Sequence, residues 1–490
     1  MTRSRSWRGG IMSRDRKVTM AMFRAARRTT AIAAAAALLV AAAAAASQHG
    51  APAGSQAVVL ITIDTLRSDF VFGGPQQPRT PFLDRLAGGG VVFTNAHAPS
   101  SWTPPSMASL FTSLAPRSHG VVRGHVQAGV SKAVGQPILA PSLVTLAERL
   151  QRAGYLTIGV PANVHLAAGQ GFDQGFDRYY GAAQFLPAPE VNRELGRQMQ
   201  SAFGVDWKRA WKQRKTFLWL HYFDPHDPYF AQQPWIGQYA PDFAAKPGVF
   251  PAGIVMKELK RRYPAPDPTL ASRLKALYQA EISFLDESLR RLDDEIGFAE
   301  EDVLLVLSSD HGEELAEHGG LGHGRTLYEE VLRIPLLIRW PARLGAGRRS
   351  DETATLLDVA PTLLDLLGLP LPPDAHGHSL ATLTSDRGAR VKGPSFYDLQ
   401  LAPMDATAVR DEKWKLIVSR RGGVRTQLFD LDLDPGERND VAAANAEQVR
   451  RLSWLLERWE KGLPPPPADL RTIEPDPQVK EQLRALGYVN

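Results

Sequence analysis

Two segments of the sequence place metal-binding side chains directly after apolar runs. Asp64 follows the run from residue 57 to 63, and the adjacent pair Asp310 and His311 follows a second run and precedes Gly312. Carboxylate oxygens and imidazole nitrogens bind divalent metal ions, and a glycine lets the backbone approach closely. An Asp in such a position can also be a turn or a helix cap, and the histidine can belong to a solvated loop. Taken alone, each segment has both interpretations.

Thr103 offers a second kind of chemistry, because it stands at the start of a helical pattern. Threonine is a good N-cap and proline tolerates the first helical positions, so a structural role is one interpretation. The same place puts a hydroxyl where amide N–H groups and the helix dipole favour an anion. The two prolines that follow have no N–H, so the donors would come from Ser106 and Met107. Capping and a nucleophilic role for Thr103 are compatible.

Further histidines lie in two loops. His226 belongs to the segment His-Tyr-Phe-Asp-Pro-His-Asp-Pro-Tyr at 221–229, which follows an apolar run and is rich in proline. His311, His318 and His323 are three of the twelve histidines of the chain. Binding of a ligand or anion is one interpretation of these side chains, because loops at strand ends often carry function. The other is a solvated loop in which histidines occur by chance.

The sequence also predicts the scaffold that would position these residues. Apolar runs alternate with helical patterns; strands are expected at 57–63, 91–94, 155–160, 216–222, 303–308 and 334–340, and helices at 80–86, 105–114, 142–152, 268–295 and 355–367. Strands that are apolar throughout are typical of a mostly parallel sheet between two layers of helices. Ligands of such α/β sheets lie at the carboxyl ends of the strands, where Asp64 and Asp310 fall.

The pattern changes after about residue 390. Short β-like runs precede one helix at about 446–460, which predicts a small antiparallel sheet with a helix packed on it. We therefore expect a catalytic domain at 56–390 and a smaller C-terminal α+β subdomain at 391–490. The stretches 181–214 and 232–267 are rich in proline, aromatic and charged residues, and look like insertions that shape a substrate cleft.

The N-terminus predicts export. Residues 1–47 carry nine basic side chains and one acidic one, and an alanine-rich apolar run occupies residues 31–46. A basic segment, a short apolar segment and a small-residue exit are typical of a signal peptide. We therefore expect a periplasmic or extracellular protein. An uncleaved membrane anchor is the alternative, although the run is shorter than the ~20 residues of a membrane span. No later stretch predicts a stable span in the mature chain.

Charge and cysteine content narrow the function classes. The whole chain has a net charge of +5. Residues 1–47 alone carry +8, so the mature chain carries about −3. Binding to nucleic acid is therefore not expected, because the basic character leaves with the signal peptide. The chain contains no cysteine. Disulfides, a thiolate nucleophile and a lipidated N-terminal cysteine are excluded.

Together these segments resemble the sulfatase family of the alkaline phosphatase superfamily over nearly all of the mature chain. Residues 103–106, Thr-Pro-Pro-Ser, align with the family's nucleophile signature, in which Cys or Ser is followed by x-Pro-Ser-Arg. Residues 309–312, Ser-Asp-His-Gly, match its second metal motif, and 322–329 resemble the segment that holds a substrate-binding Lys. The resemblance implies the alkaline-phosphatase-like α/β fold and an enzyme that acts on phosphoric or sulfuric esters.

Departures from the family pattern bear on the mechanism. Sulfatases oxidise the signature Cys or Ser to formylglycine, which Thr103 cannot become. The signature Arg is replaced by Met107, and the second Asp of the usual Asp-Asp metal pair is replaced by Thr65. The remaining residues are similar to those of relatives that use Thr, such as phosphoethanolamine transferases and lipoteichoic acid synthases.

The resemblance implies one divalent metal ion, held by Asp64, Thr103, Asp310 and His311. Two carboxylates, one imidazole and an alkoxide suit Zn²⁺ or Mn²⁺ better than Ca²⁺, which prefers six to eight oxygens. The catalytic residues would be Thr103 as nucleophile with His226 and His323, which hold non-bridging oxygens and protonate the leaving group. Second-rank substrate contacts would be His318, Arg325 and Ser106.

Three functions remain in competition. The first is an exported hydrolase or transferase that cleaves a phosphate mono- or diester through a covalent intermediate on Thr103. The second is a sulfuric ester hydrolase, and the third is a non-catalytic binding protein on the same fold. For either enzyme, the expected partner is a small-molecule, glycan or lipid-headgroup ester.

Overall fold

The computed structural model describes residues 57–122, 136–181, 185–229, 233–241, 268–384, 393–401 and 403–473, together with residues 477 and 481. The expected signal peptide and most of the stretch 232–267 lie outside this part of the chain. Residues 55–490 form one compact unit. Within the described part, none of the helices combines the length and apolarity that crossing a membrane requires.

An eight-stranded sheet forms the centre of this unit, in the order β11-β2-β10-β7-β1-β6-β4-β5. Its strands are β1 (Ala57–Ile63), β2 (Val91–His97), β4 (Leu156–Pro161), β5 (Arg178–Tyr179), β6 (Thr216–Tyr222), β7 (Leu304–Ser309), β10 (Arg333–Arg339) and β11 (Arg348–Thr355). All neighbours pair in parallel except β10, which is antiparallel to β2 and β7. The predicted mostly parallel sheet is therefore confirmed.

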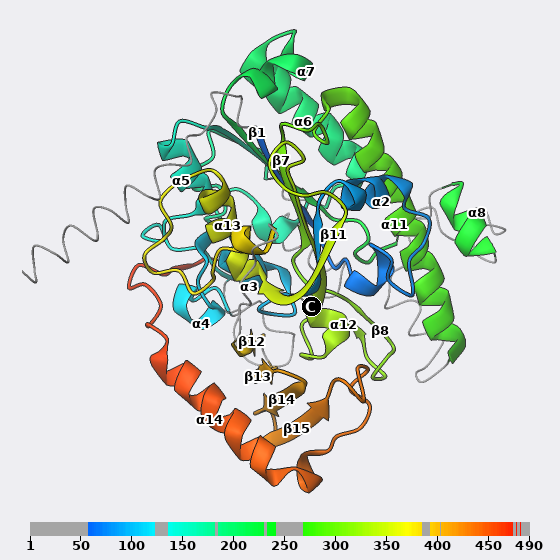
Figure 1. Cartoon of the computed structure of the whole chain (residues 1–490), viewed down its shortest axis with the longest axis vertical. Coiled ribbons are helices and arrows are strands. Elements are labelled where there is room, and N and C mark those ends of the chain that lie inside the picture. Colours follow the sequence, from blue (N-terminus) through cyan, green and yellow to red (C-terminus); the bar gives the residue numbers. More distant parts are fainter. Residues whose placement is uncertain are drawn as a thin grey trace, which may run out of the picture. The chain divides into compact units, whose positions relative to one another are not determined.

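Helices cover both faces of this sheet (Figure 1). One face is covered by α2 (Pro81–Gly88), α6 (Ala188–Phe203) and α11 (Pro268–Ile296), and the other by α3 (Thr103–Thr112), α5 (Leu146–Arg152) and α13 (Val359–Leu366). Alternation along β1 supplies both cores, because Val59 and Ile61 belong to the first while Val58 and Leu60 belong to the second. The predicted helical layers are thus confirmed.

The stretch 181–214 differs from the expected insertion. It contains α6, whose buried residues Val191, Leu195 and Met199 pack in the same core as β1. This helix is a layer of the domain, because its apolar stripe repeats at helical spacing and needs the sheet to cover it.

Shorter elements complete the described part of the chain. They are η1 (Ser68–Phe70), α4 (Pro116–His119), β3 (Gln136–Pro137), η2 (Val164–Leu166), α7 (Trp207–Ala210), η3 (Trp211–Gln213), α8 (Trp235–Tyr239), β8 (Glu314–Leu315), β9 (Leu321–Gly322), α12 (Glu329–Leu332), η4 (Leu356–Asp358), η5 (Ala381–Thr384), η6 (Ala442–Ala444) and β16 (Thr472–Ile473).

A four-stranded antiparallel sheet follows in the C-terminal part. Its strands, in spatial order, are β12 (Ser395–Leu399), β13 (Ala406–Asp411), β14 (Trp414–Ser419) and β15 (Arg425–Asp430). Helix α14 (Ala446–Gly462) packs Leu452 and Leu456 on one face of this sheet. The other face packs against Trp102 and Val331 of the larger part. The predicted small sheet with its helix is confirmed.

A buried lysine ties the two sheets together. The Lys415 ammonium on β14 is fully buried and pairs with Glu329 of α12 and with Glu437, at 2.9 Å to each carboxylate. Glu329 is also 3.1 Å from His97 of β2 and 3.2 Å from Arg410. Burial alone would lower the pKa of Lys415, but the two carboxylates hold it above its usual range.

Replacing Lys415 by methionine is expected to lower the free energy of unfolding by about 3–5 kcal/mol, because it leaves carboxylates buried without their main partner. Denaturation with guanidinium chloride, followed by circular dichroism, measures this change. Lys413→Met is the matched control, since the Lys413 side chain is 40% exposed and its partner Asp430 also accepts from the backbone N–H of Asp432. Its loss should therefore change stability far less. Equal effects of the two substitutions would contradict a structural role for the buried network.

Candidate active site

Strand pairing brings Asp64 and Asp310 together. Ile63 at the end of β1 lies beside Ser309 at the end of β7, so the residues that follow them meet at the carboxyl edge of the sheet. Both carboxyl groups are fully buried. The Oδ1 atom of Asp310 accepts hydrogen bonds from the backbone N–H groups of Thr65 (3.1 Å) and His311 (2.9 Å). These bonds fix the orientation of the Asp310 carboxylate.

Three ligand atoms converge beside this pair. Within the described part of the chain, neither Asp64 Oδ1 nor Asp310 Oδ2 has a hydrogen-bond partner. The Nε2 atom of His311 is 3.8 Å from the first and 3.4 Å from the second. Burial and the neighbouring Asp64 charge raise the pKa of Asp310 to about 7. Buried oxygens without donors are costly, and a divalent cation between them would satisfy both.

The orientation of the His311 ring fits a metal ligand. Its Nδ1 lies 2.9 Å from the carbonyl oxygen of Gly312. Because a carbonyl oxygen only accepts, Nδ1 carries the proton and Nε2 presents its lone pair to the two carboxylates. Asp64, Asp310 and His311 could therefore hold one metal ion.

The second oxygen of Asp64 has partners that sequence reasoning missed. Asn163 Nδ2 donates to Asp64 Oδ2 at 2.6 Å, and His221 Nε2 is 3.4 Å from the same oxygen. His221 is held in turn by Thr62, at 2.9 Å between Nδ1 and Oγ1. These contacts turn the Oδ1 atom of Asp64 toward Asp310. Their positions in the sequence could have indicated this role, because Asn163 lies just past β4 and His221 lies near the end of β6, at the same edge of the sheet.

Thr103 meets this group from the first residue of α3. Its Oγ1 lies 3.3 Å from His311 Nε2, and its side chain is almost completely buried. The expectation that Thr103 caps α3 is wrong, because the N-cap is Trp102 and Thr103 is the first helical residue. From that position the hydroxyl turns to His311 instead of back to the helix.

His226 and His323 lie beside the same group. The ring centroids of His323 and His311 are 4.4 Å apart, and those of His226 and His323 are 5.0 Å apart. His226 also stacks on Phe223, with 4.4 Å between centroids. His323 Nδ1 is 3.2 Å from Glu313 Oε1, a contact that sequence reasoning missed. Burial lowers the pKa of His323 to about 4.

Ser106, His318 and Arg325, the further substrate contacts expected from the sequence, lie in three different surroundings. Arg325 is exposed, and its charge helps to lower the pKa of His323 after burial, the main cause. Ser106 is buried, and its hydroxyl donates to the carbonyl oxygen of Ser100 at 2.9 Å, which fixes the loop before Thr103. The ring of His318 is held elsewhere: it is 2.7 Å from Glu330, 3.1 Å from the Glu437 carbonyl and stacked on Tyr328. Among the described contacts, His318 thus belongs to a different group.

Thr65, which replaces the expected second Asp, has an unusual backbone conformation. Its φ of 57° is left-handed, a region that β-branched residues rarely adopt. In this conformation its N–H reaches Asp310, while its hydroxyl is buried without a hydrogen-bond partner among the described groups. Strain of this kind is typically kept where a site requires it.

The fold and this edge of the sheet define an α/β enzyme, and comparison with known families identifies which one. The sulfatase family model matches residues 56–369. A second model, the C-terminal region of N-sulphoglucosamine sulphohydrolase, matches residues 316–460. The chain belongs to the sulfatase family, in the alkaline phosphatase superfamily, and is a hydrolase that acts on ester bonds.

Curated relatives and solved structures agree with this assignment. An N-acetylgalactosamine-6-O-sulfatase of Bacteroides thetaiotaomicron is 27% identical over 78% of this chain and 89% of its own. A choline-sulfatase of Rhizobium meliloti is 26% identical over 79% and 83%. One solved structure is of a protein in complex with its substrate, D-glucosamine-2-N,6-O-disulfate. It has a TM-score of 0.66 at 20% identity and covers 83% of this chain and 98% of that one. A phosphonate monoester hydrolase of Silicibacter pomeroyi has a TM-score of 0.64 at 20% identity, covering 83% and 95%. Both structures share the fold.

Proposed function

We propose that this sulfatase-family hydrolase cleaves a phosphate mono- or diester through a covalent intermediate on Thr103. The observation that carries the proposal is the position of the Thr103 hydroxyl. It starts a helix and lies 3.3 Å from His311 Nε2, beside two buried carboxylate oxygens that lack hydrogen-bond partners among the described residues. The meeting of these groups supports catalysis over a purely binding role.

Asp64, Asp310, His311 and Thr103 would hold one divalent metal ion. Two carboxylate oxygens and an imidazole nitrogen suit Zn²⁺ or Mn²⁺ better than Ca²⁺. When bound, such an ion acts as a Lewis acid that lowers the pKa of a coordinated hydroxyl and neutralises charge on the substrate. The ligand types of this chain therefore support Zn²⁺ or Mn²⁺ as the proposed metal.

The hydroxyl of Thr103 would lose its proton to solvent and attack phosphorus, so that an Oγ–phosphorus bond forms as the bond to the leaving oxygen breaks. His226 and His323 would hold the non-bridging oxygens, and one of them would give the leaving oxygen a proton. Water or an acceptor hydroxyl then attacks phosphorus, the Oγ–phosphorus bond breaks, and Thr103 is restored. To hold and protonate substrate oxygens, each histidine ring would carry a proton on both nitrogens, with Nδ1 facing a protein oxygen and Nε2 facing the substrate. The negative charge of the bound substrate would favour this charged form against the burial that lowers both pKa values.

Phosphate esters are expected to react faster than sulfate esters at this site. Formylglycine can expel sulfate because its second hydroxyl restores the aldehyde, whereas Thr103 has one hydroxyl. A threonyl sulfate could be released only by attack at sulfur, whereas a threonyl phosphate is released by attack at phosphorus. Turnover of nitrophenyl phosphate, bis-nitrophenyl phosphate and nitrophenyl sulfate, with the metal varied, measures this preference.

A sulfuric ester hydrolase is the second candidate, because the curated relatives named above are sulfatases. If nitrophenyl sulfate is the fastest of the three substrates, the preference for phosphate is wrong and this candidate takes its place. A sugar ester as substrate is supported by the N-acetylgalactosamine-6-O-sulfatase and by the structure bound to a glucosamine disulfate.

Export to the periplasm or the extracellular space is also part of the proposal. It rests on the basic and alanine-rich pattern of residues 1–47. N-terminal sequencing of protein recovered outside the cytoplasm tests it, with a start near Gln48 as the expected result. Full-length chain in washed membranes would show that the segment is an anchor.

A further inference from the structure

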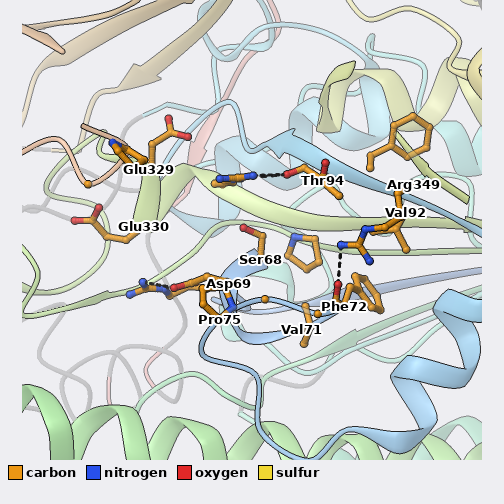
Figure 2. A pocket seen from close by; sticks show the side chains of 18 of the residues that line it. Ser68, Asp69, Val71, Phe72, Pro75, Val92, Thr94, Glu329, Glu330 and Arg349 are labelled. Atoms are coloured by element: carbon orange, nitrogen blue, oxygen red, sulfur yellow. Dashed lines mark hydrogen bonds and ion pairs between the residues drawn. The ribbon is translucent and has the colours of Figure 1, made fainter. Parts of the chain in front are cut away.

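A second cavity, of about 420 Å³, has none of the proposed catalytic or metal-binding residues in its lining. Its walls come from residues 67–75, from β2, β10 and β11, from α12, from Glu317 and from the loop at 435–438. Figure 2 shows Phe72, Val92 and Arg349 on one side of it and Glu329 and Glu330 on the other. Its apolar lining includes Phe72 and Val92 of one core and Phe93 of the other. Because none of the residues proposed to act on the substrate lines it, the cavity is distinct from the site around Thr103.

Each acidic residue of this lining is engaged by another group of the protein. Arg67 binds Asp69 at 2.8 Å and Glu317 at 2.9 Å. Glu329 belongs to the buried network of Lys415, and Glu330 is 2.7 Å from His318 Nδ1. Each carboxylate thus has a positively charged or hydrogen-bonding partner within the protein.

Three arginines of the lining have no such counter-charge. The guanidinium of Arg333 donates to the carbonyl oxygen of Thr94, and that of Arg349 donates to the carbonyl oxygen of Phe72 at 2.7 Å. Among the described residues, Arg438 has no hydrogen-bond or ion-pair partner. No carboxylate of the described part of the chain forms an ion pair with any of the three.

The lining carries four arginines and four carboxylates, and the three arginines without a carboxylate partner are the feature that favours an anion. We propose that the cavity binds a small organic anion, of the size of a sugar unit, through a sulfate or carboxylate group held by Arg333, Arg349 and Arg438. A volume of about 420 Å³ lies in the range of small-molecule sites. Guanidinium groups donate paired hydrogen bonds to two oxygens of a carboxylate or sulfate, and Phe72 and Val92 offer apolar surface to the body of the ligand.

Isothermal titration calorimetry with glucose 6-sulfate, glucuronate and neutral glucose tests the proposal. All proteins are full chains that carry Thr103→Ala, so that no turnover interferes. The two charged sugars are expected to bind and glucose is not. The double substitution Arg349→Gln with Arg438→Gln should weaken binding about tenfold or more, because it removes two charge-assisted contacts. Raising the salt concentration should weaken binding too.

The matched control is Arg152→Gln with Arg193→Gln, which removes the same charge from exposed arginines on helices α5 and α6. Its affinity should stay within about twofold of the parent, since distant surface charges are screened. Equal weakening by both double substitutions would overturn the proposal. A third protein with His323→Ala locates the ligand: if it loses binding while the Arg349 and Arg438 protein keeps it, the ligand lies in the catalytic site and the cavity is not its site.

Inorganic sulfate tests the organic part of the ligand. It should bind more weakly than glucose 6-sulfate, because it makes no contact with the apolar surface. Equal affinity would overturn the assignment to an organic anion. If Thr103 is not the nucleophile, turnover of glucose 6-sulfate would appear as a continuing heat signal, whereas glucuronate carries no ester and still tests the cavity. A failure of the proposed function is therefore distinguishable from a failure of this proposal.

Discussion

Replacing Thr103 by alanine is expected to lower kcat for a phosphodiester by about four orders of magnitude or more, as removal of other covalent nucleophiles does. Without the hydroxyl, no Oγ–phosphorus bond can form. The substitution should hardly change stability, because the Thr103 side chain does not cap α3 and is hydrogen-bonded to His311 instead. Loss of one such bond costs about 1 kcal/mol.

Two variants and one direct measurement accompany this prediction. Thr112→Ala is the matched control, because it removes a hydroxyl from the same helix that donates to the carbonyl oxygen of Ala108, and its activity should be nearly unchanged. Thr103→Ser keeps a hydroxyl and should retain measurable turnover. Mass spectrometry of acid-quenched enzyme should show a phosphorylated peptide that contains Thr103. Undiminished turnover by Thr103→Ala would rule the mechanism out.

Replacing Asp310 by asparagine is expected to remove most of the bound metal and to lower activity about 100-fold or more, in line with losses at other metal sites. The amide oxygen can still accept from the N–H groups of Thr65 and His311, but a neutral NH₂ group then replaces the oxygen that faces Asp64. Elemental analysis of the purified protein, together with kcat, measures both effects.

Stability in the presence of a chelator separates this role from a structural one. Asp310→Asn removes one of two buried like charges and gives Asp64 a donor, so its Tm without metal should equal or exceed that of the parent. Asp358→Asn is the control, because the Asp358 carboxylate accepts from the backbone N–H groups of Thr355 and His378. It should keep the metal. Full metal content in Asp310→Asn would contradict the ligand assignment, and calcium alone in the parent would favour the sulfuric ester hydrolase.

Several features of the site could be predicted from local patterns. Fully apolar runs indicated the parallel strands. Because ligand-binding residues of such sheets lie at the carboxyl ends of the strands, Asp64 and Asp310 were expected to lie close together. The structure bears this out, since Thr65, the residue after Asp64, donates its N–H to Asp310 from 245 residues away in the chain. This worked because strand identity and the position of a residue past a strand end depend on a few neighbouring residues. His226 and His323 required the family resemblance, since a histidine in a loop carries no periodic pattern.

The amino-acid sequence by itself determined the α/β class, the order of the main strands and helices, and the residues that gather at the carboxyl edge of the sheet. Only the tertiary structure decided which atom of each residue faces the site. Asn163 and His221 turn the carboxylate of Asp64 from 99 and 157 residues away, and Trp102 takes the capping position expected for Thr103. The tertiary structure also decided the character of the cavity lined by Arg333, Arg349 and Arg438. Ion pairs and hydrogen bonds engage the carboxylates of its lining and leave these arginines without a carboxylate partner. Such orientations follow from packing between distant segments, which no local pattern records.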